Sequence, residues 1–353
     1  MARITYNPDP AGKLILNPGN NMREDNYSIG LPVEIIKRLD SFRLRDNLEN
    51  KMKARTHQVE AINFCLRALN AGHARCMVQM PTGSGKSFVI RRIAQDCLKQ
   101  GMNVYILCPT EEIIEQQRID SLREGLIPVI EKAELHASRF ARYIIGSFST
   151  MWHRYEKHRR EKTLALIDEC HHFNYDAPTN CKIAGIFERV IGFSATPWSD
   201  GCLDFFEKRL HVYPLSQAIR DQVNCGYQLR EWSDPVPGKY QVVYCSNLDD
   251  IRRMCLRIAP SDYAVYQEGD ARRTISRFRY GSLGTIVVNR MLTEGFDQPQ
   301  IKRVWIARNT ASSIFALQMA GRALRPHNGQ EAEIYIQNQQ THDTLRAALD
   351  RAG

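Results

Sequence analysis

Residues 80–87 read Met80-Pro81-Thr82-Gly83-Ser84-Gly85-Lys86-Ser87, and this stretch is the most informative part of the chain. An apolar run (76–80) leads into it, and a segment with helical spacing of apolar residues (88–98) follows. A strand, a glycine-rich turn and a helix in this order form a cradle whose backbone N–H groups converge on an anion. Lys86 then reaches the β and γ phosphates of a nucleoside triphosphate, and the Ser87 hydroxyl ligates Mg²⁺. We therefore predict a triphosphate site made by Thr82, Gly83, Ser84, Gly85, Lys86 and Ser87.

One position departs from the usual pattern of such a cradle. Met80 stands where the first glycine of the pattern is normally found. An ordinary glycine turn is the alternative, but a plain turn does not need a lysine and a serine at this spacing. We call residues 80–87 the phosphate loop.

Composition limits the classes of protein to consider. The chain has 353 residues, enough for two domains, and its apolar runs are far too short to cross a membrane. Its start is polar and rich in Asn and Pro, so no signal peptide is predicted. Ten cysteines without a C-x-x-C pair indicate buried reduced thiols and a cytoplasmic location. The net charge of +9 suits a polyanionic partner.

The order of apolar runs predicts an α/β fold with parallel sheets. Residues 1–50 form an N-terminal extension with turn signals and one amphipathic stretch at 33–39. A first domain (51–233) and a second domain (234–353) follow, separated by the proline-rich break at 233–238. The second domain has no phosphate loop of its own. The predicted strands are 76–80, 104–108, 143–145, 164–167 and 190–193, then 240–245, 263–266, 285–288, 304–307 and 333–336.

Two adjacent carboxylates, Asp168 and Glu169, follow the apolar run 164–167. The carboxyl end of a strand in an open α/β sheet borders the crevice where ligands bind. Asp168 is expected to hold the Mg²⁺ that bridges the phosphates, and Glu169 to orient and deprotonate the attacking water. The alternative is a pair of solvated acids at a strand end. A metal site at Cys170-His171-His172 is not favoured, because adjacent side chains alternate in direction.

Together these motifs resemble, in order, those of superfamily 2 helicases and translocases of the DExH type. Asp168-Glu169-Cys170-His171 resembles the DECH box. The resemblance implies two tandem RecA-like domains with ATP in the cleft between them. It also implies that Arg55 and Gln58 form the upstream glutamine motif, in which Gln58 contacts adenine. Ser194 and Thr196 would couple hydrolysis to movement, and the strand-gripping residues would be Pro109, Thr110, Gln116, Ser147 and Thr150.

The second domain resembles the same family at two further motifs. Residues 293–297 resemble motif V, which implies a nucleic-acid contact for Thr293 and nucleotide contacts for Gly295 and Asp297. Residues 318–325 match the Q-x-x-G-R-x-x-R motif, which implies a nucleotide contact for Gln318 and catalytic roles for Arg322 and Arg325. Three positions apart, these two arginines would share one helix face and point together at the γ-phosphate.

The segment 193–198 followed by 210–219 is similar to the XPB, UvsW and type I/III restriction-translocase branch. This resemblance implies an ATP-dependent DNA helicase or translocase, with ATP and Mg²⁺ as cofactors and single-stranded, duplex or branched DNA as partner. We expect a monomeric, phage-like protein that can also bind a protein partner. Two alternatives stay open: an RNA helicase, and a non-unwinding motor subunit that serves a nuclease or recombination partner. The basic run 153–160 either follows a phosphate backbone or is simply solvated.

Overall fold

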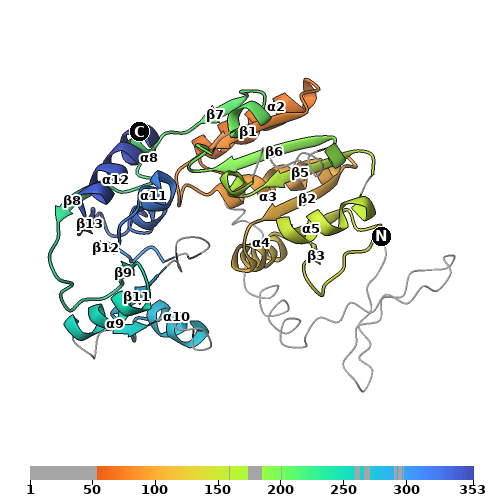
Figure 1. Ribbon diagram of the computed structural model, residues 1–353. Coiled ribbons are helices and arrows are strands. Elements are labelled where there is room, and N and C mark those ends of the chain that lie inside the picture. The colour runs from red at the N-terminus through yellow and green to blue at the C-terminus, as the bar shows by residue number, and fades with distance from the viewer. Residues whose placement is uncertain are drawn as a thin grey trace, which may run out of the picture. The chain divides into compact units, whose positions relative to one another are not determined.

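The computed structural model describes residues 54–158, 160–173, 185–199, 201–258, 263–265, 271–289, 292, 296 and 298–353 (Figure 1). The chain divides into two units, Met1–Arg55 and Thr56–Gly353, and every element described below lies in the second. The predicted extension 1–50 and its amphipathic stretch lie outside the described residues.

The first sheet has the strand order β3-β4-β2-β5-β6-β1-β7, and each neighbouring pair is parallel. Its apolar runs are buried on both faces, as expected for a parallel sheet covered by helices. The strands are β1 (Arg75–Gln79), β2 (Asn103–Cys108), β3 (Val129–Glu131), β4 (Tyr143–Ser147), β5 (Thr163–Ile167), β6 (Arg189–Ser194) and β7 (Leu210–Val212).

Helices cover the first sheet on both sides. One face packs against α2 (Thr56–Asn70), α3 (Lys86–Lys99) and α4 (Glu111–Arg123). The other face packs against α5 (Phe148–Arg154), α7 (Cys202–Phe205) and the 3-10 turn η2 (Cys170–His172). A second 3-10 turn, η1 (Tyr155–His158), follows α5.

The second sheet has the order β10-β11-β9-β12-β13-β8, again with parallel neighbours. Helices α10, α11 and α12 cover one face, and α9 covers the other. The elements are β8 (Tyr227–Glu231), β9 (Gln241–Cys245), α9 (Leu248–Arg257), β10 (Tyr263–Val265), α10 (Ala271–Arg279), β11 (Thr285–Val288), β12 (Arg303–Ala307), α11 (Ser313–Gly321), β13 (Ala332–Ile336) and α12 (Gln339–Ala352).

The predicted fold class, two tandem RecA-like α/β domains with parallel sheets, is confirmed. All ten predicted strands are present within a residue or two of the expected bounds. The prediction omitted β3 and β7, which have three residues each, and β8. β3 and β7 carry too few residues to show a period. β8 has five residues, but its sequence, Tyr-Gln-Leu-Arg-Glu, contains no apolar run.

The proline-rich break at 233–238 does not separate the sheets. It joins β8 to β9, and both strands belong to the second sheet. The second sheet therefore begins before the predicted boundary at residue 233, and the division into domains otherwise stays a prediction.

The crossing between the sheets is made by residues 213–225, which we call the connector and which include α8 (Leu215–Arg220). Its buried side chains pack on both sides. Tyr213, Ala218 and Val223 belong to the core of the first sheet, whereas Leu215, Ile219 and Cys225 pack with the core of the second. The connector is thus a packed element and not a solvated linker.

Nine cysteines lie among the described residues, and all are unbridged thiols, eight of them buried. Within the same part of the chain, no helix combines the length and the apolarity that crossing a membrane requires.

Candidate active site

The phosphate loop joins β1 to α3 with two glycines in left-handed conformation, Gly83 at φ 85° and Gly85 at φ 93°. Between them, the buried Ser84 donates its hydroxyl to Pro81 O at 2.7 Å and holds the turn closed. Gly85 is the N-cap of α3 and provides no side-chain cap. The first amides of a 14-residue helix are therefore left for an external acceptor, which is the geometry of an anion site.

Two side chains of α2 hold the phosphate loop by contacts with one of its carbonyl oxygens. His57 Nε2 lies 3.0 Å from Ser84 O, and Gln58 Nε2 donates to the same oxygen at 3.2 Å. A Cβ on Gly85 would lie 2.3 Å from Gln58 Nε2, and its φ of 93° is a conformation that residues with a side chain rarely adopt, so glycine is favoured here. Gln58 thus holds the loop in shape, and its predicted contact with adenine stays a prediction. Arg55 is exposed and directly precedes α2.

The two carboxylates stand at the carboxyl end of β5, as predicted. Asp168 is 3% exposed and accepts hydrogen bonds from Gln117 Nε2 at 2.9 Å and Glu169 N at 3.1 Å. Burial, and then the negative charge of Glu169, raises the pKa of Asp168 from 3.8 to about 6, against the opposing effect of Lys86. A buried carboxylate beside a lysine is the kind of hard oxygen ligand that Mg²⁺ accepts together with phosphates.

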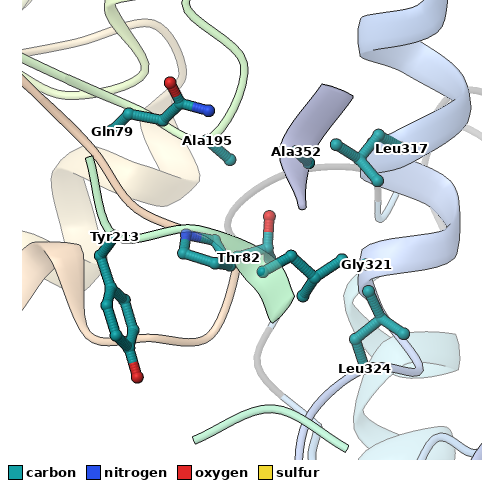
Figure 2. A pocket seen from close by; sticks show the side chains of 10 residues that line it. Gln79, Thr82, Ala195, Tyr213, Leu317, Gly321, Leu324 and Ala352 are labelled. Carbon is teal, nitrogen blue, oxygen red and sulfur yellow. The ribbon is translucent and has the colours of Figure 1, made fainter. Parts of the chain in front are cut away.

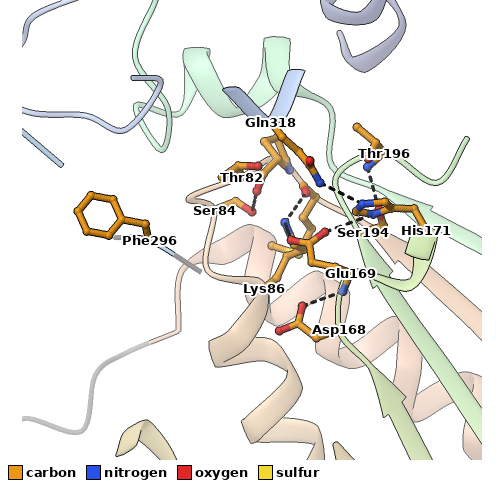
Figure 3. A network of polar contacts seen from close by, with 12 residues as sticks. Thr82, Ser84, Lys86, Asp168, Glu169, His171, Ser194, Thr196, Phe296 and Gln318 are labelled. Atoms are coloured by element: carbon orange, nitrogen blue, oxygen red, sulfur yellow. Dashed lines mark hydrogen bonds and ion pairs between the residues drawn. The ribbon is translucent and has the colours of Figure 1, made fainter. Parts of the chain in front are cut away.

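A chain of polar contacts links the phosphate loop to the carboxylate pair and to the predicted coupling motif at Ser194 and Thr196 (Figure 3). Lys86 Nζ lies 3.5 Å from Glu169 Oε1 and 3.4 Å from Met80 O. The other carboxylate oxygen, Oε2, lies 3.4 Å from His171 Nδ1. The predicted phosphate-binding lysine and the predicted base therefore form one ion pair, and His171 extends it.

His171 connects this pair to the second sheet. Its Nε2 lies 3.0 Å from Gln318 Nε2 on α11, and its Nδ1 lies 2.8 Å from Ser194 Oγ. The two ring nitrogens of His171 therefore contact two different elements, and the tautomer of the ring decides which atom donates in each contact. Ser194 Oγ also accepts from Thr196 N at 2.9 Å. Of the residues predicted to couple hydrolysis to movement, Ser194 is thus one hydrogen bond from the DECH box, and Thr196 is linked to it through Ser194.

The two arginines meet, but not in the predicted way. Helix α11 ends at Gly321, so Arg322 and Arg325 do not share a helix face. Instead, both guanidinium groups donate to Phe296 O, at 2.8 and 3.0 Å. Arg325 also lies against the phosphate loop, since a Cβ on Gly83 would be 3.0 Å from its Cγ. The tertiary contact with Phe296 brings the arginines together.

The predicted strand-gripping residues of the first sheet occupy two sites. Pro109 and Thr110 follow β2, and Thr110 Oγ1 caps α4 by accepting from Ile113 N at 3.4 Å. Gln116 points to solvent and bonds Asp120. Its neighbour Gln117, which the sequence analysis missed, is the buried one and contacts Asp168. The usable signal was the spacing of Gln117 from the buried Ile113 and Ile114 along α4.

Ser147 is the last residue of β4 and Thr150 lies in α5, and Ser147 Oγ accepts from Thr150 N at 3.2 Å. Thr150 Oγ1 in turn accepts from Ala133 N at 3.2 Å, so this motif also shapes the loop after β3. In the basic run 153–160, Arg154 and Lys157 pair with the buried Glu131. That pairing favours a structural role for these two side chains over a phosphate contact. Thr293, Gly295 and Asp297 lie outside the described residues.

A narrow, mostly apolar pocket lies between the phosphate loop and α11 (Figure 2), with a cavity volume of about 20 Å³. Thr82 and Gly321 approach each other closely beside it, because a Cβ on Gly321 would be 3.3 Å from Thr82 Cβ. The pocket has room for about one water molecule and not for a nucleotide. It marks where the loop and α11 pack together.

Comparison with known proteins supports this interpretation. Residues 51–199 match the family "Type III restriction enzyme, res subunit". A 51.5 kDa protein of Lactococcus phage (isolate 7-9) is 24% identical, with 74% of this chain and 65% of the phage protein covered. The chain thus spans a little under two thirds of that relative.

Among solved structures, an HsdR fragment of a type I restriction enzyme from Vibrio vulnificus YJ016 has a TM-score of 0.66 at 19% identity, covering 90% of this chain and 72% of that one. S. cerevisiae Dbp5 bound to RNA and ADP BeF3 has a TM-score of 0.63 at 14% identity, covering 92% of each chain. The helicase MrfA bound to DNA has a TM-score of 0.64 at 15% identity, covering 91% of this chain and 51% of that one. The family match covers the first part of the chain, and the solved structures show that the fold of two parallel α/β sheets is shared with these proteins.

Proposed function

We propose that this protein is an ATP-dependent DNA helicase or translocase that uses hydrolysis to move along or remodel DNA. The observation that carries the proposal is the continuous contact chain from Lys86 through Glu169 and His171 to Gln318. It joins the phosphate loop, the carboxylate pair and a helix of the second sheet. A motor needs contacts of this kind, because binding and hydrolysis of the triphosphate must change the positions of both domains.

ATP and Mg²⁺ fit the residues present. The uncapped start of α3 and the buried Lys86 favour a polyphosphate, and Asp168 with the half-buried Ser87 offers oxygen ligands for the metal. Bound Mg²⁺ would neutralise charge on the phosphates. Glu169 is placed to orient water. Arg325 lies against the loop, and Arg322 donates to the same oxygen, Phe296 O, so that both could stabilise negative charge on the transferred group.

DNA is the proposed substrate over RNA for two reasons. The family matched by residues 51–199 is described as a restriction-enzyme subunit, and the structurally similar helicase MrfA was solved bound to DNA. The glutamine at the start of the arginine motif, Gln318, also departs from the histidine of DEAD-box RNA helicases. The net charge of +9 suits either nucleic acid. The structural likeness to Dbp5 keeps RNA as the alternative to be tested. A motor that does not unwind, and serves a nuclease or recombination partner, is the second alternative.

The deciding experiment is steady-state ATPase of the wild type, titrated separately with single-stranded, duplex and forked DNA and with RNA. Lys86→Ala is the test variant, and Lys99→Ala at the exposed end of the same helix is its matched control. We expect stimulation by DNA, abolished in Lys86→Ala and retained in Lys99→Ala. Stimulation of the ATPase by RNA alone would show that RNA, and not DNA, is the substrate. ATP turnover that ignores every nucleic acid would refute the motor assignment for the isolated chain.

Strand displacement of a forked duplex then separates the two remaining possibilities. Displacement by the wild type and not by Lys86→Ala supports a helicase. DNA-stimulated ATPase without displacement supports translocation alone.

A further inference from the structure

Asn224, near the end of the connector, is buried between the two parts of the proposed ATP site. Its side-chain Nδ2 donates to Thr82 O in the phosphate loop at 3.0 Å and to Leu324 O at 3.2 Å. Only 2% of the residue is exposed, and its backbone N–H donates to Ala218 O at 3.0 Å. One amide group therefore bridges the loop of the first sheet and the segment that carries the arginines.

The direction of this amide is fixed by its surroundings. Both neighbouring groups are carbonyl oxygens, which only accept, so a flipped amide would turn its own oxygen toward them. The buried Oδ1 has no hydrogen-bond partner among the described residues. The contribution of Asn224 therefore lies in its two N–H donors, and a residue that merely filled the same space would not replace it.

The segment 322–325, which we call the arginine segment, is held by further hydrogen bonds from Cys225 and Lys302. Cys225 N donates to Leu324 O at 2.9 Å, and Lys302 Nζ donates to Ala323 O at 3.2 Å and to Arg325 O. Because the connector is packed into both cores, these bonds fix the arginine segment relative to the phosphate loop. Arg325 consequently lies in van der Waals contact with the loop.

We propose that Asn224 is a positioning residue of the ATPase, which holds the arginine segment against the phosphate loop so that Arg325 is in place for hydrolysis. This inference rests on the proposed function. Asn224 itself touches only protein carbonyls, so its effect on the reaction passes through Thr82 and Leu324. Its loss should lower kcat and leave ATP binding by the loop nearly unchanged.

The test compares Asn224→Ala and Asn224→Asp with Gln222→Ala, which removes an exposed amide from the same turn. We expect kcat to fall about tenfold in both Asn224 variants, the effect of losing one to two net hydrogen bonds. The KM for ATP should stay within about threefold, and Gln222→Ala should match the wild type. Asp keeps the shape of Asn but lacks the donors, so a defect confined to Asn224→Ala would assign the effect to packing and overturn the proposal.

A double variant with Arg325→Ala adds a second criterion. If Asn224 acts by placing Arg325, the double variant is no slower than Arg325→Ala alone. Multiplicative losses in kcat would overturn the proposal.

Hydrogen–deuterium exchange without added nucleotide gives a readout that does not depend on ATPase. Peptides covering 80–87 and 321–326 should exchange faster in Asn224→Ala than in the wild type, while unchanged exchange there would count against the bridge. If the wild type shows no ATPase but exchange responds as expected, the proposed function fails and the bridge itself stands.

Discussion

Replacing Asp168 with asparagine should stabilise the fold at neutral pH, although it should abolish the activity. Burial and the adjacent Glu169 raise the pKa of Asp168 from 3.8 to about 6, so the ionised carboxylate is less favourable in the folded than in the unfolded chain. Each pKa unit corresponds to about 1.36 kcal/mol, which gives a cost of about 3 kcal/mol at pH 7.5. Asparagine carries no charge and removes this cost.

Part of the gain is offset by hydrogen bonding. Asp168 accepts from both Gln117 Nε2 and Glu169 N, whereas the asparagine amide has one oxygen and can accept only one of these bonds in the same geometry. A buried donor that loses its acceptor costs about 1 kcal/mol or somewhat more. We therefore expect Asp168→Asn to raise the free energy of unfolding by about 2 kcal/mol.

The pH dependence gives this prediction its sign. Because the folded-state pKa is the higher one, protonation favours the folded wild type as pH falls from 6 toward 3.8. By pH 5 the wild type should recover about 1 kcal/mol, and the advantage of the variant should shrink by that amount.

Urea unfolding at pH 7.5 and pH 5.0, without nucleotide or Mg²⁺, measures both free energies. Asp204→Asn, an exposed carboxylate of the same sheet's α7, is the control and should change stability by less than about 0.5 kcal/mol. A variant that is less stable than the wild type at pH 7.5, or an advantage that does not change with pH, would show that the charge of Asp168 is not costly in the fold.

Three further substitutions test the geometry of the site. Gly85→Ala should weaken binding of a fluorescent ATP analogue by more than tenfold, because the new Cβ would meet an α2 side chain at 2.3 Å. The control Gly101→Ala, at a similar φ in open space, should bind the analogue normally. Equal losses of affinity would mean that the positive φ, and not the steric clash, causes the effect. Gln117→Met should lower kcat roughly tenfold through the lost bond to the DECH-box aspartate, and Gln116→Met should not; the reverse ranking in an ATPase assay would contradict the structure. Gly192→Ala should lower the free energy of unfolding by about 1–3 kcal/mol, since its Cβ would lie 2.4 Å from an aromatic carbon, and wild-type stability in urea would show that this face of the sheet can relax.

Ten of the strands and the phosphate loop could be predicted from the sequence alone. Runs such as 104–108 and 285–288 are short, apolar and separated by helical periods, and burial of a parallel strand on both faces imposes that composition. The loop could be predicted as well, because its two glycines and the lysine stand next to one another in the sequence. In the structure Gly83 and Gly85 adopt positive φ, and Lys86 begins the helix that follows. These features depend on neighbours in the chain, so their signal is local.

Tertiary structure decided which side chains meet. Gln116 and Gln117 are adjacent in sequence, yet only Gln117 faces Asp168, because the rotation of α4 on the sheet selects it. Arg322 and Arg325 converge on Phe296 O after their helix has ended.

The connector illustrates the same limit. Proline and glycine at 233–238 indicated a linker, but the chain crosses between the sheets at 213–225 and buries side chains in both cores. The positioning role proposed for Asn224 depends on its hydrogen bonds to Thr82 O and Leu324 O, which lie 142 and 100 positions away in the chain. The sequence determined the elements and the chemistry available at their ends, since both arise from local periodicity and residue type. Contacts between distant segments arise only when the elements pack, and these decided which of the available groups form the site.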